Sequence, residues 1–272
     1  MTTACSWLAG PQQRLPRVIA PFRTETVGSY ITRLAHANHL TRSRLQTHVA
    51  GSSTRRARAD WLAAATGIEE NILRDRLIGF GAANGTNAEQ KARVRPACRL
   101  CMARRGVHEP VHCWLPPHAT VCFRHALWTG PGATSWQNQH DLRGRPDVLA
   151  AAQRHHQLIK RHHELAGNAL TEARHILTWW AHVAHVDQGA ARTCDAQRAT
   201  TADLDTYPDL IAVASVLADH RHLMAVEQPT RYPPWSEHLL DQINRHATTQ
   251  RTDHRPLQHW IDDQRIIGHI HL

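Results

Sequence analysis

Apolar residues in the N-terminal part of the chain recur at the spacing of short amphipathic helices. Between residues 24 and 38 they return every three or four positions, as they do on one face of a helix. The stripe consists of Val27, Tyr30, Ile31, Leu34 and Ala35. Thr24 or Glu25 is suited to begin this helix, and Asn38 is suited to end it.

The stretch that follows, HLTRSRLQTHVAG, predicts a second short helix. Thr41 is a suitable N-cap, Leu40 before it can pack onto Leu45, and Gly51 ends the element. Two short helices joined by about three residues have the geometry of a helix-turn-helix.

A similar pair is predicted from the stretch ADWLAAATGIEENILRDRLIGF. Asp60 can cap a helix that ends at Gly67, and a second apolar face follows with Ile68, Ile72 and Leu77. Both helix pairs fit a DNA-binding unit. They also fit a small helical bundle, since short helix pairs are common in proteins that never touch DNA.

Turn-rich and polar stretches divide the chain into five segments. We expect a leader at 1–13, a helix-turn-helix-like region at 14–80, a linker at 81–95, a zinc-binding segment at 96–130 and a helical domain at 131–272. The zinc-binding segment holds most of the candidate strand, in VHCWLPPHATVCF.

The C-terminal segment has the periodicity of several longer helices. One begins at Pro146 and Asp147, a third begins near Pro208, and two shorter ones surround Trp235 and Trp260. The first has an apolar stripe of Leu149, Ala152, His156 and Ile159, and the second one of Leu170, Ala173, Leu177, Trp180 and Ala184. The predicted fold is mainly α: a helix-turn-helix-like bundle, a small zinc-ribbon-like element and a C-terminal helical bundle.

Composition adds a basic surface to this picture. The net charge is +9, which favours an anionic partner such as nucleic acid. Lys91 and Lys160 are the only lysines, and an excess of arginine is also what GC-rich coding produces. The sequence has neither a signal-peptide pattern nor a run of apolar residues long enough to cross a membrane, so we expect a cytoplasmic protein.

Four residues have the spacing of a zinc site. Cys98 and Cys101 form a C-x₂-C pair, and Cys122 and His125 form a C-x₂-H pair twenty residues later. Such turns direct two ligands each at one ion, and four protein ligands leave no position for water. We therefore predict one structural Zn²⁺. Metal binding also supplies folding free energy to a segment of about thirty-five residues, which is too short to bury a core of its own.

Other cysteines and histidines leave alternatives open. Cys113 and His118 lie between the two pairs and can replace a ligand, although Cys113 beside Trp114 also fits a core thiol. Cys5 and Cys194 have no partner at metal-site spacing. A catalytic zinc is disfavoured, because the chain has neither an H-E-x-x-H motif nor the H-x-E pair of a deaminase. No phosphate-binding Walker loop is present either.

The stretch SYITRLAHANHLT resembles the N-terminal segment of the TniQ family. The family carries Ser-Tyr/Trp-x-x-Arg-Leu-Ala-x-x-Asn, which is matched by Ser29, Tyr30, Arg33, Leu34, Ala35 and Asn38. Its lead-in is similar to Leu15, Pro16, Pro21 and Glu25, and its zinc segment to CRLCMARRG, Trp114 and VCFRHALW. The resemblance covers about residues 14–130. The chain departs from the pattern at His39 and Ala126, where glycine is common in the family.

The resemblance implies a target-site selector of Tn7-like and related DNA transposons. Such proteins bind target DNA or join an RNA-guided complex, and they recruit an AAA+ regulator of the TnsC or TniB kind. The family is not known for catalysis, and some members form homodimers. The alternatives are a stand-alone zinc-containing DNA-binding regulator and, disfavoured by the missing motifs, a zinc-dependent enzyme.

Arginines near the first two helices are the candidate DNA contacts. They are Arg33, Arg42, Arg44, Arg55 and Arg56. Contacts of this kind go to phosphate and weaken with salt. We expect residues 1–130 to contribute most of the DNA affinity. The apolar faces of residues 131–272 are expected to contribute most of the affinity for protein partners.

Overall fold

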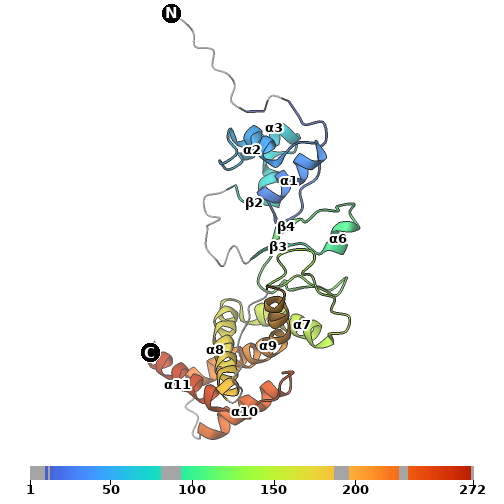
Figure 1. Ribbon diagram of the computed structural model, residues 1–272. Helices are drawn as coiled ribbons and strands as arrows, with labels where there is room; N and C mark the ends of the chain where they lie inside the picture. The colour runs from blue at the N-terminus through green and yellow to red at the C-terminus, as the bar shows by residue number, and fades with distance from the viewer. Residues whose placement is uncertain (1–9, 12, 81–92, 187–195, 227–231, 271–272) are drawn as a thin grey trace, which may run out of the picture. The chain divides into compact units, whose positions relative to one another are not determined.

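The computed structural model describes residues 10–11, 13–80, 93–186, 196–226 and 232–270 (Figure 1). The fold is mainly helical, as predicted, with a few short strands. Cys5, Cys194 and most of the predicted linker lie outside the described residues. Within the described chain, no helix is both long and apolar enough to cross a membrane.

Contacts divide the chain into two compact units, and neither is a single continuous segment. The first comprises residues up to 117 together with 133–139, and the second comprises 118–132 together with 140–272. The boundary that the sequence predicts at residue 130 therefore differs from the one observed, because residues 133–139 return to the first unit.

The first unit contains the short helices that the periodicity predicts. They are α1 (Val27–Ala37), α2 (Arg42–Ala50), α3 (Ala59–Thr66) and α4 (Glu70–Arg76). The unit also contains α6 (Arg99–Ala103), which the sequence pattern does not predict. Figure 1 shows α1, α2 and α3 grouped together. Their core consists of the predicted stripe of α1 together with Leu45, Val49, Leu62, Leu73 and Leu77. Of the predicted second apolar face, Leu77 is buried and Ile68 packs against this core, but Ile72 is exposed and Leu73 is buried in its place.

The helix ends agree with local sequence signals in most cases. Thr41 caps α2 by accepting a hydrogen bond from the backbone N–H of Arg44, and Gly51 and Gly67 end α2 and α3 in the left-handed conformation. The cap of α1 is Thr26. Asp60 does not cap α3, because its carboxylate pairs with Arg58 instead.

Four strands of two or three residues form a sheet in the first unit. The strands β1 (Glu25–Thr26), β2 (Leu77–Ile78), β3 (Val94–Pro96) and β4 (His112–Trp114) lie in the order β2-β1-β4-β3. β1 and β2 are parallel, and the other pairs are antiparallel. Of these strands only β4 falls in the segment where the sequence predicts one.

A buried ion pair lies where β1 meets α1. Glu25 is fully buried and accepts two hydrogen bonds of 2.8 Å from the guanidinium of Arg33. Its carboxylate also accepts bonds from the Ser29 hydroxyl and the Phe22 backbone N–H, both at 3.0 Å. A buried charge is tolerated only when it is paired and hydrogen-bonded, and this network satisfies both conditions.

The second unit has a two-stranded hairpin, β5 (Val121–Cys122) and β6 (Leu127–Trp128), and long helices. The helices are α7 (Pro146–His162), α8 (Glu164–Val186), α9 (Ala196–Val226), α10 (Tyr232–Asn244) and α11 (Arg255–Ile270). α9 contacts each of the other four (Figure 1). Trp235 lies on α10 and Trp260 on α11, as predicted.

Two predictions for the long helices are wrong. The buried stripe of α7 consists of Val148, Ala151, Ala152, His155 and Leu158. It lies one residue before most positions of the predicted stripe. Leu149, His156 and Ile159 therefore do not face the core. α9 begins at Ala196, and Pro208 lies inside it. A proline within a helix removes one backbone hydrogen bond without always ending the helix. The side chain of Ala184 lies outside the described residues.

Candidate metal centre

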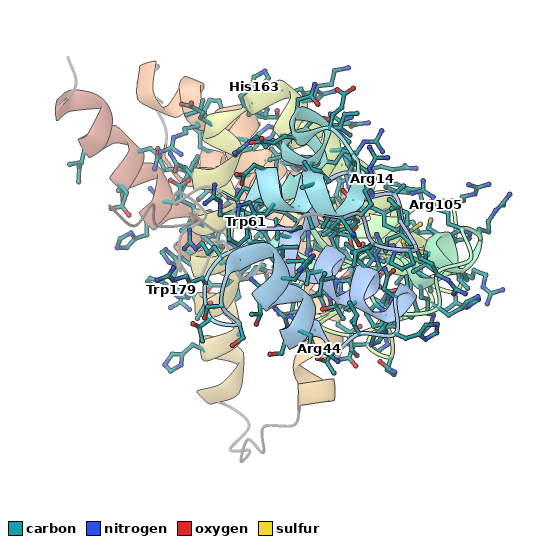
Figure 2. All side chains as sticks on the ribbon, turned by 90° about the horizontal axis from the view of Figure 1, so that it is seen from above. Arg14, Arg44, Trp61, Arg105, His163 and Trp179 are labelled. Carbon is teal, nitrogen blue, oxygen red and sulfur yellow. The ribbon has the colours of Figure 1, made fainter. Side chains whose placement is uncertain are left out.

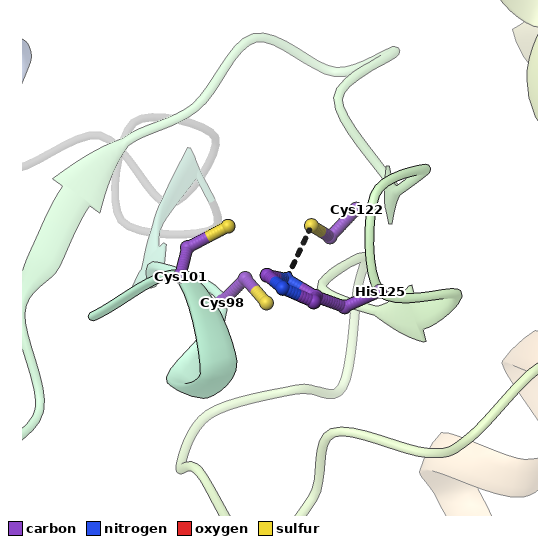
Figure 3. A group of neighbouring side chains, drawn as sticks. All are labelled: Cys98, Cys101, Cys122 and His125. Atoms are coloured by element: carbon purple, nitrogen blue, oxygen red, sulfur yellow. Dashed lines mark hydrogen bonds between the residues drawn. The ribbon is translucent and has the colours of Figure 1, made fainter. Parts of the chain in front are cut away.

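The structure brings the four predicted ligands together. The ligand atoms of Cys98, Cys101, Cys122 and His125 all lie within 4.8 Å of one another (Figure 3). A tetrahedral ion with metal–sulfur bonds of about 2.3 Å holds its ligand atoms about 3.8 Å apart. The side chains therefore need to approach by no more than about 1 Å to bind such an ion.

The C-x₂-C pair is positioned by the start of α6. Cys98 is the N-cap residue of α6, and its carbonyl accepts a hydrogen bond of 3.1 Å from the Met102 backbone N–H. This turn places Cys101 one helical turn on, so that both thiols face the same point (Figure 3). Cys98 is buried and Cys101 is half-buried.

Two residues far along the chain hold this turn in place. Gln139 is almost fully buried, and its amide donates to the carbonyls of Pro96 and Ala97, both at 3.1 Å. Its side-chain oxygen accepts from the Arg99 backbone N–H at 2.9 Å, and the Trp136 indole donates to the Ala97 carbonyl at 3.1 Å. Gln139 and Trp136 thus satisfy the backbone on both sides of Cys98. No motif spacing marks them, and sequence reasoning missed both.

The C-x₂-H pair lies in the turn of the β5–β6 hairpin. Cys122 ends β5, and the His125 backbone N–H donates to the Cys122 carbonyl at 3.1 Å. The Cys122 Sγ and His125 Nδ1 atoms are 3.6 Å apart (Figure 3). Ala126, which follows the histidine, has a φ of +47°, a conformation that favours glycine. Its carbonyl accepts from the Leu142 backbone N–H, which fixes the turn.

The two alternative ligands lie outside this group. Cys113 is buried in β4, and burial raises the pKa of its thiol to about 12. A thiol must lose its proton to bind a metal, so this environment disfavours Cys113 as a ligand. The ring of His118 packs against His155 and His156 in the second unit, at centroid distances of 6.3 and 4.7 Å.

The donor set restricts the chemistry of a bound ion. Three thiols and one imidazole are soft and borderline ligands, which favour zinc or iron–sulfur chemistry over calcium or magnesium. No disulfide joins the cysteines that the structure describes. Four protein ligands fill a tetrahedral shell, so an ion at this site has no position for substrate.

One of the predicted DNA contacts, Arg33, is buried in the first unit. Its side chain is only 5% exposed and is held by Glu25, with a further bond of 3.1 Å to the Ala20 carbonyl. A phosphate cannot reach this guanidinium without breaking the buried ion pair. Arg33 is therefore a structural residue of the first unit, and its assignment to DNA contact is wrong.

The other four arginines are exposed on the first unit. Arg42 and Arg44 lie in the first turn of α2, and Arg55 and Arg56 lie in the loop before α3. Figure 2 marks Arg44 together with Trp61 of the neighbouring α3. A groove of about 510 Å³ is lined by Arg42, Arg55 and Arg56. The remaining polar side chains of its lining are neutral: Ser43, Gln46, Ser53 and Thr54.

Comparisons with known proteins identify no relative for this chain. No protein-family model, no curated protein and no solved structure matches it.

Proposed function

We propose that the chain is a TniQ-like adaptor, which binds target DNA in transposition and recruits an AAA+ transposition regulator. The observation that carries the DNA-binding part is the groove beside α2. Three arginines line it, neutral hydroxyl and amide groups complete it, and no carboxylate belongs to its lining. Arginine with hydroxyl and amide groups is the usual set of donors to the phosphates of nucleic acid.

The Cys₃His group supports a structural role for the metal. We propose that the ion is Zn²⁺, because zinc takes this donor set at structural sites and binds it without redox change. Its contribution is to hold the C-x₂-C turn and the β5–β6 turn at one point, which stabilises the fold. The resemblance that links the chain to TniQ includes these same four residues.

The ATPase-recruiting part of the proposal rests on the resemblance and on the second unit. Among the described residues of that unit, large apolar side chains are exposed at Phe123, Leu165, Trp179 and Ile266. Trp179 lies on α8 (Figure 2). Exposed aromatic side chains are frequent anchors of protein interfaces.

DNA binding is tested by fluorescence anisotropy with a duplex of about 30 base pairs at rising salt. We expect the affinity of the full chain to fall steeply with salt, because binding releases counterions from each contacted phosphate. Removing two phosphate contacts of the groove with Arg42→Gln and Arg55→Gln should reduce the slope of log K against log salt by about 2. The matched control is Arg74→Gln, an exposed arginine on α4 that is already paired with Glu70.

A second measurement separates the adaptor from a stand-alone regulator. The full chain is immobilised and the AAA+ ATPase encoded beside it is captured with and without DNA. Capture that needs DNA, or that DNA strengthens, supports the adaptor. DNA binding with no capture of the ATPase would favour the regulator, and equal salt slopes for the double variant and the control would remove the groove as the DNA contact.

A further inference from the structure

A second cluster of cations lies in the other unit, among α7, α9 and the end of α10. A cavity of about 400 Å³ is lined there by Arg154 and Arg161 of α7 and by Arg245, which follows α10. Its volume is in the range of small-molecule pockets. Neither the metal centre nor the groove beside α2 shares a residue with it.

The charge of this lining is unbalanced. Asp219 is the only carboxylate among the lining residues, and its Oδ1 lies 2.9 Å from the Nε2 atom of His162. That carboxylate is therefore already engaged by a neighbouring side chain. The three arginines leave an excess of positive charge at the cavity.

Arg154 is the most informative of the three residues. Its Nε atom is buried and has no hydrogen-bond partner. The guanidinium donates one long bond, of 3.4 Å, from Nη2 to the His246 carbonyl. Burial lowers the pKa of Arg154, and no neighbouring carboxylate raises it again. Leaving a buried N–H donor such as this Nε unpaired is unfavourable.

An anion in the cavity would satisfy this arrangement. The planar fork of arginine matches the oxygens of a phosphoryl group, and charge-assisted bonds of this kind are about twice as strong as neutral ones. Three arginines around one cavity can neutralise more than one negative charge. The neutral amide of Gln157 in the lining offers a further donor, whereas the Ser215 hydroxyl already donates to the Ile211 carbonyl at 2.7 Å.

We propose that this cavity binds a small polyphosphate anion, such as the diphosphate group of a nucleotide, with Arg154, Arg161 and Arg245 as its ligands. This site is separate from the proposed DNA contact in both residues and ligand. The second unit would then have a binding site for a phosphorylated small molecule, separate from the candidate metal centre.

The test is isothermal titration of the full, metal-loaded chain with inorganic pyrophosphate. We expect saturable binding, weakened about tenfold or more by Arg161→Gln and by Arg245→Gln, because each removes a charge-assisted contact. Both side chains are exposed, so these substitutions leave the fold intact. Arg154→Gln should abolish binding, and its folding is checked by circular dichroism. Lys160→Gln is the matched control: it removes one exposed charge from α7 outside the lining.

Three outcomes would overturn the proposal. One is the absence of saturable pyrophosphate binding, and another is equal loss of affinity in Lys160→Gln and the arginine variants. The third comes from the same duplex DNA used as a second ligand: if the arginine variants lose DNA affinity while pyrophosphate does not bind, the cavity contacts a nucleic-acid backbone. Intact DNA binding in variants that no longer bind pyrophosphate supports the small anion. Failure of DNA binding altogether leaves this result unaffected.

Discussion

The two units bury their polar groups in different ways. The first is built from helices of five to eleven residues and strands of two or three, and its centre holds a charged pair, Glu25 and Arg33. The second is built around α9, a helix of 31 residues, and its buried polar groups are mainly neutral ones such as Tyr207, Thr120 and His155. Short elements bury little apolar surface, so directional bonds such as those of the Glu25–Arg33 pair carry more of the stability of the first unit.

Removal of the metal should have the largest effect. We expect about one zinc per chain by elemental analysis, and chelation should remove on the order of 10 kcal/mol of binding free energy. Peptide mapping after alkylation provides the measurement. Cys98, Cys101 and Cys122 should become reactive on chelation at about pH 8. Cys113, whose pKa is raised to about 12 by burial, should react only if the fold around it is lost as well. A folded chain without metal, or unchanged reactivity after chelation, would contradict the metal centre.

Breaking the buried ion pair should be the next largest effect. Arg33→Met leaves the Glu25 carboxylate buried and without its cation, which should cost about 4 kcal/mol. Hydrogen exchange followed by mass spectrometry should locate the loss in peptides of the first unit. Combining Glu25→Gln with Arg33→Met should recover part of the lost free energy of unfolding, because the pair then leaves no buried charge.

A control and a comparison accompany this substitution. Arg74→Met breaks an exposed pair with Glu70 and should cost less than about 0.5 kcal/mol. Leu217→Ala, in the core of the second unit, should cost about 3 kcal/mol through the cavity that it leaves. If Arg33→Met cost no more than Arg74→Met, the contrast between an ionic and an apolar centre would be lost.

The neutral network of the second unit should respond to acid. His155 donates to or accepts from the Tyr207 hydroxyl at 3.0 Å, and burial lowers its pKa to about 4. The nearby His118, His156 and Arg174 contribute to this lowering of the pKa of His155, each less than burial does. The unfolded chain, with an ordinary histidine pKa of about 6.5, then binds the proton more readily. The stability that neutral His155 provides is present above about pH 6.5 and is lost as the pH falls towards 4.

The expected loss is about 2 kcal/mol between about pH 7.5 and pH 5. Urea unfolding of the wild type and His155→Asn in the same buffers measures it. Asparagine keeps a hydrogen-bonding atom near the position of Nδ1 but does not titrate, so its stability should vary less with pH over this range. Metal loss at low pH affects both proteins, so it cancels when the free energy of unfolding of His155→Asn is subtracted from that of the wild type. Equal pH dependence in the two proteins would show that His155 does not titrate as described.

The smallest effect should come from two turns. His39 and Ala126 have φ values of +56° and +47°, where a side chain is unfavourable. These are also the two positions where the TniQ pattern commonly has glycine. His39→Gly and Ala126→Gly should each raise the free energy of unfolding by about 1 kcal/mol in urea denaturation. Gly144 serves as the reference, because its φ is not positive and an added Cβ would meet no neighbouring atom. Gly144→Ala should therefore not lower the free energy of unfolding by as much as about 1 kcal/mol.

Local signals were enough to predict some parts of the fold. Thr41, Gly51 and Gly67 act through bonds to residues three or four positions away, and the Cys and His pairs are recognisable by spacing alone. The strands β1 and β2 were missed, because two residues have no periodicity and their partners lie about fifty positions apart. The face of α7 was wrong by one residue. Apolar side chains occupy both neighbouring stripes, and packing on α9 decides between them.

Longer-range contacts explain what was missed at the site. Glu25 was predicted to begin a helix and Arg33 to contact DNA, whereas the two side chains form a buried ion pair. Gln139 and Trp136 lie about forty residues after the backbone groups that they bind. Only the three-dimensional structure relates such positions.

The return of residues 133–139 to the first unit also sets an order of assembly during synthesis. A ribosome adds about 5–20 residues each second, and domains fold as their residues emerge. The backbone around Cys98 acquires its last bonds only after Gln139 has left the ribosome, by which time the β5–β6 hairpin has also been made. The first unit is therefore completed late, and a chain that ends at residue 130 lacks both the Trp136 and the Gln139 bonds to that turn.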